Sequence, residues 1–384
     1  MNVGGVRVGG VAAGVKPGKE PDMAVIIADR AVPTAAVFTS SRSAAAPVVV
    51  SRAHVADGFI RAVVVNSGCA NAGTGESGIL DARRMAAAAA GAIGCSPDEV
   101  IVCSTGPIGP PLPMEAVMPG IGAAVTAATA AGWESAAAAI MTTDTHPKLV
   151  ESTMTVDGGT VRTVGMAKGA GMVRPDMATM LAFLVTDALV EPSVLRRVLG
   201  EVVDRTFNSM NIDGCQSTND TVVAMATGAS STEVPPDRLV GLLEGPATRL
   251  AEMIVRDAEG STRLVTVRVV GAADAEQARH VGLAITDSDL VRASFHGGDP
   301  NWGRIFGAVG VSGLEFAQSS FAVAYEDTWI ARDGRQVPFD RLGLRSRLVG
   351  DFQIDVVVGD GPGEARILSC DLSPDYVRFN AEPS

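Results

Sequence analysis

The sequence predicts an α+β protein built from layers of helices and sheets. Runs rich in Val and Ile are typical of strands, and runs rich in Ala are typical of helices. The two kinds of run are mixed along all 384 residues, and several strand-like runs lie close enough in sequence to pair in antiparallel fashion. A chain of this length indicates two or more domains with a large buried core.

The individual elements follow from these runs in chain order. The segments expected as strands in the first half of the chain are 23–29, 34–39, 60–68 and 99–106. The segments expected as helices are 79–94 and 193–210, and a later group of strands is expected at 263–272, 353–361 and 365–372.

A polar segment marks the expected boundary between domains. At 271–282 the chain leaves a strand and begins a new polar helix, with the sequence GAADAEQARHVG. Turns and polar helix starts of this kind are typical of boundaries. We therefore expect a core domain over 1–270 and a smaller C-terminal domain over 271–384.

The charge of the chain argues against two classes of partner. The net charge is −12, from 31 Lys and Arg against 43 Asp and Glu. An acidic protein has no electrostatic reason to bind DNA, RNA or anionic lipid. Aromatic residues make up only 4% of the chain, so platforms on which bases could stack are not expected.

The cysteines and the apolar segments favour the cytoplasm. The five cysteines include no C-x-x-C pair, which argues against a disulfide framework or a zinc knuckle and favours a reducing compartment. The N-terminus lacks the pattern of a secretory signal. The most apolar stretch, 121–141, is mostly Ala, Thr and Gly with Glu134 inside it, so we expect a Gly-interrupted helix and no membrane span. Acidic residues do not cluster with the four histidines, so no metal and no cofactor are expected.

The most informative segment for chemistry is MAKGAGMVRPDMATMLAFLVTDA at 166–188. Lys168 opens a Gly-rich loop, and an apolar strand-like run begins directly after Thr179. A hydroxyl at this point would lie where a loop meets a rigid strand. The plainest alternative is that Thr179 only starts the strand as a β-branched residue.

Thr179 becomes a nucleophile if the Ala178–Thr179 peptide bond breaks. No histidine is near Thr179 in sequence, but the freed α-amine would have a pKa of about 7.7–8, which suits a general base. That amine belongs to the same residue as the hydroxyl, so their proximity is built in. The small side chain of Ala178 leaves room for attack on its own carbonyl carbon.

A second segment offers an oxyanion site. In VIVCSTGPIGPPLPM at 100–114, a strand leads into Thr105 and Gly106. The threonine hydroxyl and the glycine N–H can point the same way, and each such donor is commonly worth about 3 kcal/mol to a tetrahedral oxyanion. The alternative is an ordinary exit from a strand into a loop, where Thr and Gly are frequent.

Together these segments resemble the ornithine acetyltransferase family, also called glutamate N-acetyltransferase. The resemblance covers essentially the whole chain, and its most specific block is AKGAGMVRPDMATML. The other matching motifs are NSGCANAGTG at 66–75, STGPIGPPLPM at 104–114, IMTTDTHPK at 140–148, FNSMNIDGCQSTNDT at 207–221, GDPNWGR at 298–304 and CDLSPDYVRFNAE at 370–382.

The resemblance implies a fold and a self-processing step. Family members have a four-layer α-β-β-α sandwich with a smaller C-terminal α/β domain, and they follow the logic of N-terminal-nucleophile enzymes. They cleave themselves before the threonine that corresponds to Thr179, which here would give chains 1–178 and 179–384. The two chains stay together, often as a dimer of such pairs, that is, a heterotetramer.

The resemblance also implies the reaction. The acetyl group of N-acetylornithine passes to the Thr179 hydroxyl, ornithine leaves, and glutamate then takes the acetyl group, which recycles it in arginine biosynthesis. Some members also use acetyl-CoA as a substrate for direct synthesis of N-acetylglutamate. The catalytic residues implied are Thr179, Thr105 and Gly106.

Substrate-binding roles are implied by motif for Thr142, Lys168, Thr179, Glu259 and Asn380. Each non-nucleophilic position has a simpler alternative, for example a solvated loop charge at Lys168, a carboxylate beside Arg263 at Glu259, or a capping role at Thr142. A polar turn that includes Asp213, Thr218, Asn219 and Asp220 is expected to support the nucleophile strand.

The C-terminus departs from the family pattern. Members commonly end Asn-x-x-Tyr-x-Ser/Thr, whereas this chain ends at Ser384 one residue sooner, without the tyrosine and with Pro383 in the tail. Ser384 is retained as a substrate-binding candidate on the resemblance alone.

Two other functions stay open at this point. An amidase or aminopeptidase on the same self-processed scaffold would pass the acyl group from Thr179 to water. A non-catalytic protein could bind phosphate on its Gly-rich loops, but these lack the P-loop and dinucleotide spacings.

Overall fold

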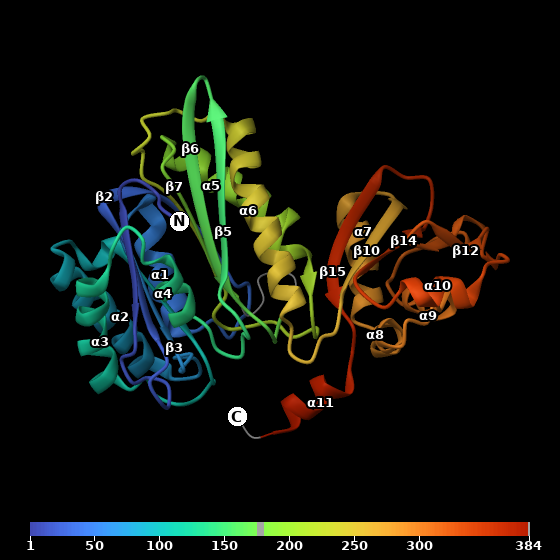
Figure 1. Cartoon of the computed structure of the whole chain (residues 1–384), viewed down its shortest axis with the longest axis horizontal. Helices are drawn as coiled ribbons and strands as arrows, with labels where there is room; N and C mark the ends of the chain where they lie inside the picture. The colour runs from blue at the N-terminus through green and yellow to red at the C-terminus, as the bar shows by residue number, and fades with distance from the viewer. Residues whose placement is uncertain (175–179, 383–384) are drawn as a thin grey trace. The chain divides into compact units, whose positions relative to one another are not determined.

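The computed structural model describes residues 1–174 and 180–382. The chain forms two compact units, which are described separately below (Figure 1). The first unit contains Met1–Asn208 and Gln216–Ile254, and the second contains Ser209–Cys215 and Val255–Ser384. The chain thus leaves the first unit at Ile254, earlier than the 270/271 boundary expected from the sequence. The reason is that the strand at 264–272, taken as the last of the core domain, belongs to the sheet of the second unit.

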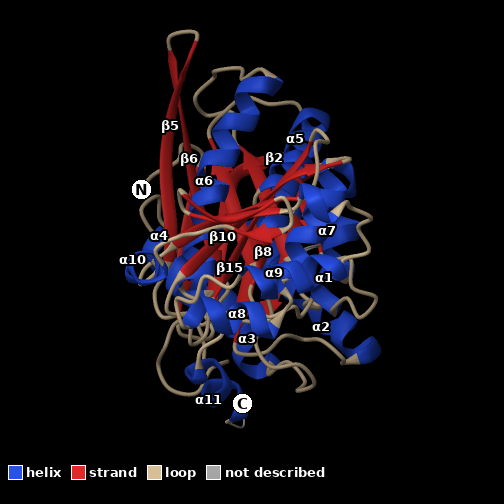
Figure 2. Ribbon diagram, turned by 90° about the vertical axis from the view of Figure 1, so that its right-hand side faces the viewer, coloured by secondary structure: helices blue, strands red, loops and turns tan. Residues whose placement is uncertain are grey.

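The first unit has an eight-stranded sheet system in the order β4-β3-β2-β9-β7-β6-β5, with β1 paired to β2. Figure 2 shows the hairpin of β5 and β6 at the margin of this system. The strands are β1 Val6–Val11, β2 Met23–Phe38, β3 Phe59–Ser67, β4 Val100–Thr105, β5 Lys148–Val156, β6 Gly159–Lys168, β7 Leu181–Thr186 and β9 Thr221–Ala226.

Strand β2 divides this system into two layers. Its first part pairs with β3 and its last five residues pair with β9, with a register irregularity between Ile27 and Val32. Two strands were expected here, at 23–29 and 34–39, and the structure has one continuous strand that passes from one layer to the other. The irregularity lets the strand bend between sheets, as bulges commonly do.

Helices cover both outer faces of the first unit. Helices α1 to α3 pack on the β3–β4 layer, while α5 and α6 pack on the other layer. A core of Val, Ile, Met and Phe side chains from both layers fills the space between the sheets. The α-β-β-α sandwich expected from the family is therefore confirmed. The helices are α1 Ala46–His54, α2 Gly75–Ile93, α3 Met114–Ala127, α4 Trp133–Ala139, α5 Pro192–Arg205 and α6 Pro236–Arg256.

The apolar stretch at 121–141 is not one helix. Helix α3 ends at Ala127, and α4 begins at Trp133 after a turn that contains Gly132. Gly132 is needed there, because a Cβ at this position would collide with the Val8 carbonyl of β1. Among the described residues, no helix is long and apolar enough to cross a membrane.

The second unit has a seven-stranded sheet in the order β13-β12-β11-β14-β10-β15-β8. Its core is apolar and is formed between this sheet and α7, α8 and α9. The strands are β8 Met210–Asn211, β10 Leu264–Ala272, β11 Ala322–Tyr325, β12 Thr328–Arg332, β13 Arg335–Gln336, β14 Phe352–Val357 and β15 Gly363–Cys370. The helices are α7 Ala275–Thr286, α8 Asp289–His296, α9 Trp302–Gly310, α10 Arg341–Arg347 and α11 Pro374–Ala381.

Candidate active site

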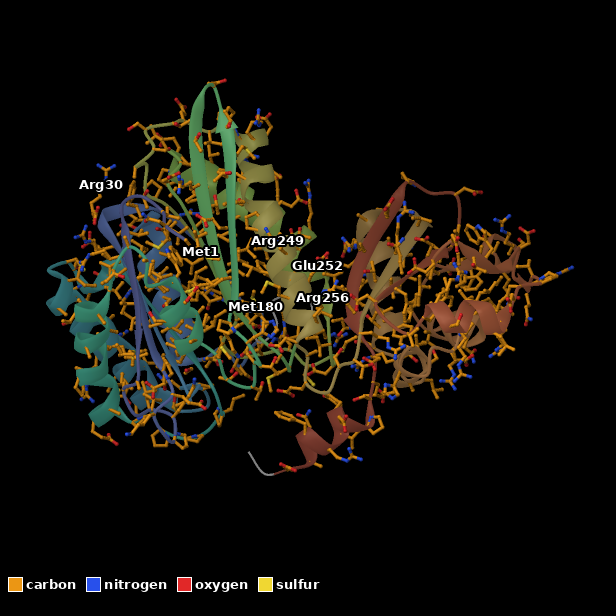
Figure 3. All side chains as sticks on the ribbon, in the orientation of Figure 1. Met1, Arg30, Met180, Arg249, Glu252 and Arg256 are labelled. Carbon is orange, nitrogen blue, oxygen red and sulfur yellow. The ribbon has the colours of Figure 1, made fainter. Side chains whose placement is uncertain are left out.

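The two residues of the expected cleavage site, Ala178 and Thr179, lie outside the described residues, and so does Ser384. The positions on either side of the cleavage segment are described. Strand β6 leads to Lys168 and Gly169, and Met180 directly precedes β7 (Figure 3). Strands β6 and β7 pair antiparallel, with Lys168 opposite Leu181. The last residue of β6 and the first residue of β7 therefore lie side by side, at the edge of the sheet that is formed by strand ends.

Asp144 is the polar centre of this edge. Its Oδ1 lies 2.6 Å from the Lys148 Nζ and accepts the Gly169 N–H at 2.7 Å. Its Oδ2 accepts the Thr142 N–H at 3.0 Å and lies 4.0 Å from the Lys168 Nζ. One carboxylate thus holds two residues that the sequence nominated for substrate binding, Thr142 and Lys168.

The electrostatics of this cluster keep Asp144 ionised. Burial alone would raise the pKa of the Asp144 carboxyl, but the ammonium groups of Lys168 and Lys148 and the Gly169 N–H outweigh it and lower that pKa to about 2. The side chains of Asp144, Lys148 and Lys168 are almost completely buried. Lys168 is therefore not the solvated loop charge considered as its alternative.

Asp144 is a residue of this site that the sequence did not predict. Its neighbours in IMTTDTHPK are polar, and an aspartate in such a polar segment is typical of an exposed turn as well as of a binding site. The observation that singles it out is structural and has no counterpart in the sequence: Lys148, its partner, opens strand β5 and is 0% exposed. A buried lysine requires a carboxylate partner nearby.

The expected oxyanion segment ends strand β4. Strands β3 and β4 run parallel, with Ser67 opposite Thr105, and the Gly68 N–H donates to the Thr105 carbonyl at 2.8 Å. Gly106 has φ of +139°, a backbone conformation that L side chains rarely adopt. A Cβ at Gly106 would lie 2.5 Å from the Cys69 backbone N. Glycine at this position allows the two chain segments to come this close.

A loop before β9 connects the oxyanion segment to the edge where β7 begins. The side-chain amide of Asn219 donates to the carbonyl oxygens of Ala70 at 2.6 Å and Ser104 at 2.9 Å. The next residue, Asp220, accepts the Met180 N–H through Oδ1 at 2.8 Å. Of the polar turn predicted from the sequence, Asn219 and Asp220 lie in this unit, whereas Asp213 belongs to the second unit.

In the second unit the structure brings together Glu259 and Asn380. The Asn380 side-chain amide donates to Glu259 Oε2 at 3.2 Å, from helix α11 to the loop that precedes β10. Glu259 is partly exposed and Asn380 is exposed. These two groups, nominated separately from the sequence, therefore form one polar pair open to solvent.

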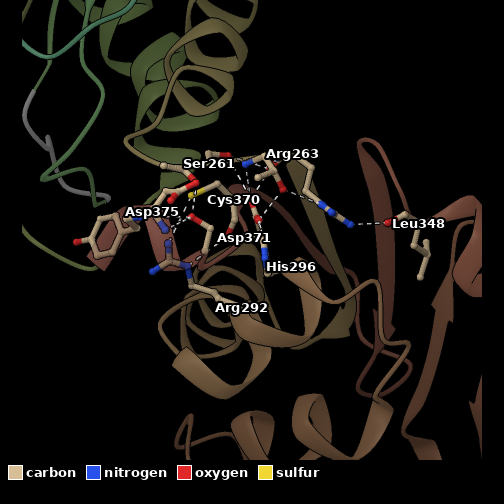
Figure 4. Close-up of polar contacts among 12 residues, drawn as sticks. Ser261, Arg263, Arg292, His296, Leu348, Cys370, Asp371 and Asp375 are labelled. Carbon is tan, nitrogen blue, oxygen red and sulfur yellow. Dashed lines mark hydrogen bonds and ion pairs between the residues drawn. The ribbon is translucent and has the colours of Figure 1, made fainter. Parts of the chain in front are cut away.

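Asp371 holds the loop that carries Glu259 (Figure 4). Its Oδ1 accepts the backbone N–H of Thr262 at 2.8 Å, and its Oδ2 accepts the Thr262 hydroxyl at 2.7 Å and lies 2.7 Å from His296 Nδ1. Gly260 fits against the backbone of Tyr376 only because it lacks a Cβ, and its carbonyl accepts the Ser373 hydroxyl. Asp371 is buried, and its hydrogen bonds hold the loop that carries Glu259 in place.

Comparison with known proteins identifies the family. A model of the ArgJ family matches residues 7–383. The chain belongs to the ArgJ family. The arginine biosynthesis bifunctional protein ArgJ of Geobacter sulfurreducens is 43% identical over 390 residues, which cover 100% of this chain and 99% of that protein. The protein of the same name from Thermus thermophilus is 45% identical over 385 residues, which cover 98% and 97% of the two chains.

A solved relative extends the comparison to structure. The crystal structure of arginine biosynthesis bifunctional protein ArgJ from Bacillus halodurans is similar with a TM-score of 0.50 and 35% identity. The similarity covers 52% of this chain and 97% of that chain. The solved chain is thus about half as long as this one.

Proposed function

We propose that this ArgJ-family chain is a glutamate N-acetyltransferase, which carries the acetyl group of N-acetylornithine to glutamate on the Thr179 hydroxyl. The observation that carries the proposal is the cluster at Asp144, which holds Thr142 and Lys168 at the sheet edge where β7 begins. Family membership supports the same function, because the full-length relatives are named bifunctional proteins of arginine biosynthesis.

Self-cleavage comes first in this proposal. The Thr179 hydroxyl attacks the Ala178 carbonyl carbon, the peptide nitrogen leaves as the Thr179 amine, and water then hydrolyses the resulting ester to release the Ala178 carboxylate. The products are chains 1–178 and 179–384. The half-length chain of the Bacillus halodurans relative supports cleavage within a related chain.

Acetyl transfer follows by double displacement. The Thr179 amine takes the proton of the Thr179 hydroxyl, whose oxygen attacks the acetyl carbonyl carbon of N-acetylornithine. The amide C–N bond breaks, and the ornithine nitrogen leaves with the proton held by the amine. The glutamate amine then attacks the acetyl ester, which returns the hydroxyl. Thr105 and Gly106 are proposed as donors to the oxyanion in both steps.

Substrate recognition uses charge. Lys168 and Thr142 are proposed to bind the amino-acid part of the substrate, and Glu259, with Asn380 beside it, to bind the side-chain ammonium of ornithine by a charge-assisted contact. Ser384 is proposed as a further contact from the tail. Acetyl-CoA is a candidate second donor. A cytoplasmic heterotetramer of two cleaved pairs is the assembly we propose.

The test is the dependence of ornithine release on glutamate. The purified protein is incubated with N-acetylornithine, with and without glutamate, and free ornithine and N-acetylglutamate are measured. We expect sustained release only with glutamate, in a one-to-one ratio with N-acetylglutamate. Without glutamate, release should stop at about one ornithine per active site, which is the amount that acetylates Thr179. Equal release without glutamate would instead establish the amidase, in which water accepts the acetyl group.

A further inference from the structure

Asp220 makes one backbone contact that no part of the proposed mechanism uses. It is 0% exposed, and its Oδ1 accepts the Met180 N–H at 2.8 Å. The other oxygen, Oδ2, is also buried and has no hydrogen-bond partner among the described residues. A buried carboxyl with so few partners is expensive for the fold, so its presence calls for a role.

The backbone of Met180 is held on both sides by consecutive residues. Asp220 binds its N–H, and the Thr221 N–H donates to its carbonyl at 3.2 Å. Strands β7 and β9 then continue as a parallel pair from Leu181 opposite Thr221. A parallel strand pair alone does not require a side chain at the N–H of the residue before it. Asp220 therefore adds a restraint at Met180, directly before β7 begins.

The same loop also restrains the oxyanion segment. Asn219, adjacent to Asp220, binds the Ser104 carbonyl at 2.9 Å, and Ser104 directly precedes Thr105. The Ser104 hydroxyl in turn donates to Asn66 Oδ1 at 2.6 Å. Two neighbouring side chains thus connect the expected oxyanion donors to the residue that follows the nucleophile.

We infer that Asp220 is a positioning residue for the nucleophile: by accepting the Met180 N–H, it sets the backbone at Met180 relative to the oxyanion segment, which Asn219 holds at Ser104. This inference rests on the proposed function. The carboxyl acts as a hydrogen-bond acceptor and takes no proton from substrate or water. Its effect is on both chemical steps, self-cleavage and acetyl transfer, because both use the same hydroxyl.

The state of the carboxyl fits an acceptor role. Burial raises the pKa of the Asp220 carboxyl well above its usual range, against the Met180 N–H, the charge of Lys168 and the Ser217 hydroxyl, which lower it. A neutral carboxyl still accepts a hydrogen bond through its carbonyl oxygen. An asparagine in its place has the same shape and an oxygen that accepts the same N–H.

The experiment compares Asp220→Ala with Asp220→Asn. Uncut precursor is followed to the two chains by intact mass, and kcat and KM for N-acetylornithine are measured on cleaved protein. Asp220→Ala should slow cleavage and lower kcat by about 100-fold, with KM nearly unchanged, because a small displacement of reacting groups has effects of this size. Asp220→Asn should stay within about threefold of the wild type in both, since it keeps the acceptor.

Asp187 offers a matched control at the opposite end of β7. It is also buried, and its Oδ1 accepts the Arg162 N–H at 2.8 Å. Asp187→Ala removes a side-chain bond of the same length to a backbone N–H, here that of Arg162 in β6, directly after β7 ends. It should therefore destabilise the fold but leave cleavage and kcat unchanged. A loss of cleavage in Asp187→Ala equal to that in Asp220→Ala would mean that any damage to β7 suffices, and would overturn the inference.

Two further outcomes separate the positioning role of Asp220 from the proposed function. Wild-type cleavage and kcat in folded Asp220→Ala would refute the positioning role while leaving the proposed function intact. Wild-type protein that neither cuts itself nor transfers acetyl would instead refute the proposed function. Should Asp220→Ala not fold, amide exchange of Met180 in ¹⁵N-methionine-labelled wild type gives the answer: strong protection is expected, and free exchange would overturn the inference.

Discussion

The two units each carry one group of candidate site residues, and the groups differ in burial. In the first unit Asp144, Lys148, Lys168 and Asp220 are buried among hydrogen bonds that hold backbone segments in place. In the second unit Glu259 and Asn380 meet at the surface, on a loop held by the buried Asp371. Buried polar groups organise a site at a high desolvation cost, whereas exposed ones are available to a substrate. Substitutions in the first group should therefore affect folding and chemistry, and those in the second should affect substrate affinity.

The largest effect is expected from Asp144→Asn. It deprives Lys148, which is 0% exposed, of its carboxylate partner. Breaking a buried pair in this way should lower the free energy of unfolding by about 3–5 kcal/mol. Asp327→Asn is the control, because its pair with Arg347 is at the surface, and its effect on denaturant unfolding should be close to nothing. Equal denaturant midpoints for Asp144→Asn and Asp327→Asn would show that burial does not decide how much these carboxylates stabilise the fold.

Asp144 also predicts a pH dependence. Its pKa is lowered to about 2 in the folded protein, against an ordinary value of 3.8. The stability that it contributes is present above the unfolded-state pKa and is lost as the pH falls through about 2. Asp144→Asn should flatten this acid limb, measured by urea unfolding between about pH 2 and 4.

Gly106→Ala should affect chemistry more than folding. The new Cβ forces the Gly106 backbone away from Cys69, in a φ region that alanine disfavours. Loss of one oxyanion donor should lower kcat about 10²–10³-fold, with the two-layer core intact by circular dichroism. Gly91→Ala in α2 is the control, because a Cβ there meets nothing within 4 Å. A Gly106→Ala enzyme with normal kcat would remove Gly106 from the oxyanion site.

Asp220→Asn should stabilise the protein increasingly as the pH rises. The folded-state pKa of Asp220 is raised above the unfolded value, so its favourable contribution is full below the unfolded pKa and is lost as the pH rises through the folded pKa. Asparagine does not titrate. The unfolding free energy of Asp220→Asn relative to the wild type should therefore grow by up to about 1.4 kcal/mol per pH unit between the unfolded-state and the folded-state pKa of Asp220. A difference that does not vary with pH would show that Asp220 is ionised in the fold.

The smallest structural effect is expected from Glu259→Ala. Its side chain is partly exposed, so the unfolding free energy should change by no more than about 0.5 kcal/mol. The KM for N-acetylornithine should rise about tenfold, which is the scale of one charge-assisted hydrogen bond. Glu276→Ala, an exposed carboxylate at the start of α7, is the control and should leave KM unchanged. Normal KM in Glu259→Ala would exclude a direct contact with substrate.

The sequence predicted the layered fold because strand and helix periodicities are local. It did not predict that 23–38 forms one strand shared by two layers, because that depends on which strands pair at each half of it. The resemblance to the family predicted Thr142, Lys168, Glu259 and Asn380. In the first unit Thr142 and Lys168 both contact Asp144, and in the second unit Glu259 and Asn380 contact each other. The organising role of Asp144 was missed, since burial turns an ordinary turn carboxylate into the partner of two lysines and only tertiary structure sets burial.

In the proposed mechanism Thr179 acts only after its own amine has been freed, and intact mass spectrometry of freshly purified protein shows whether the chain has been cut. For the wild type we predict two chains with the masses of residues 1–178 and 179–384, and for Thr179→Ala a single chain of 384 residues that transfers no acetyl group. An active wild-type protein that consists of one uncut chain would rule out this mechanism.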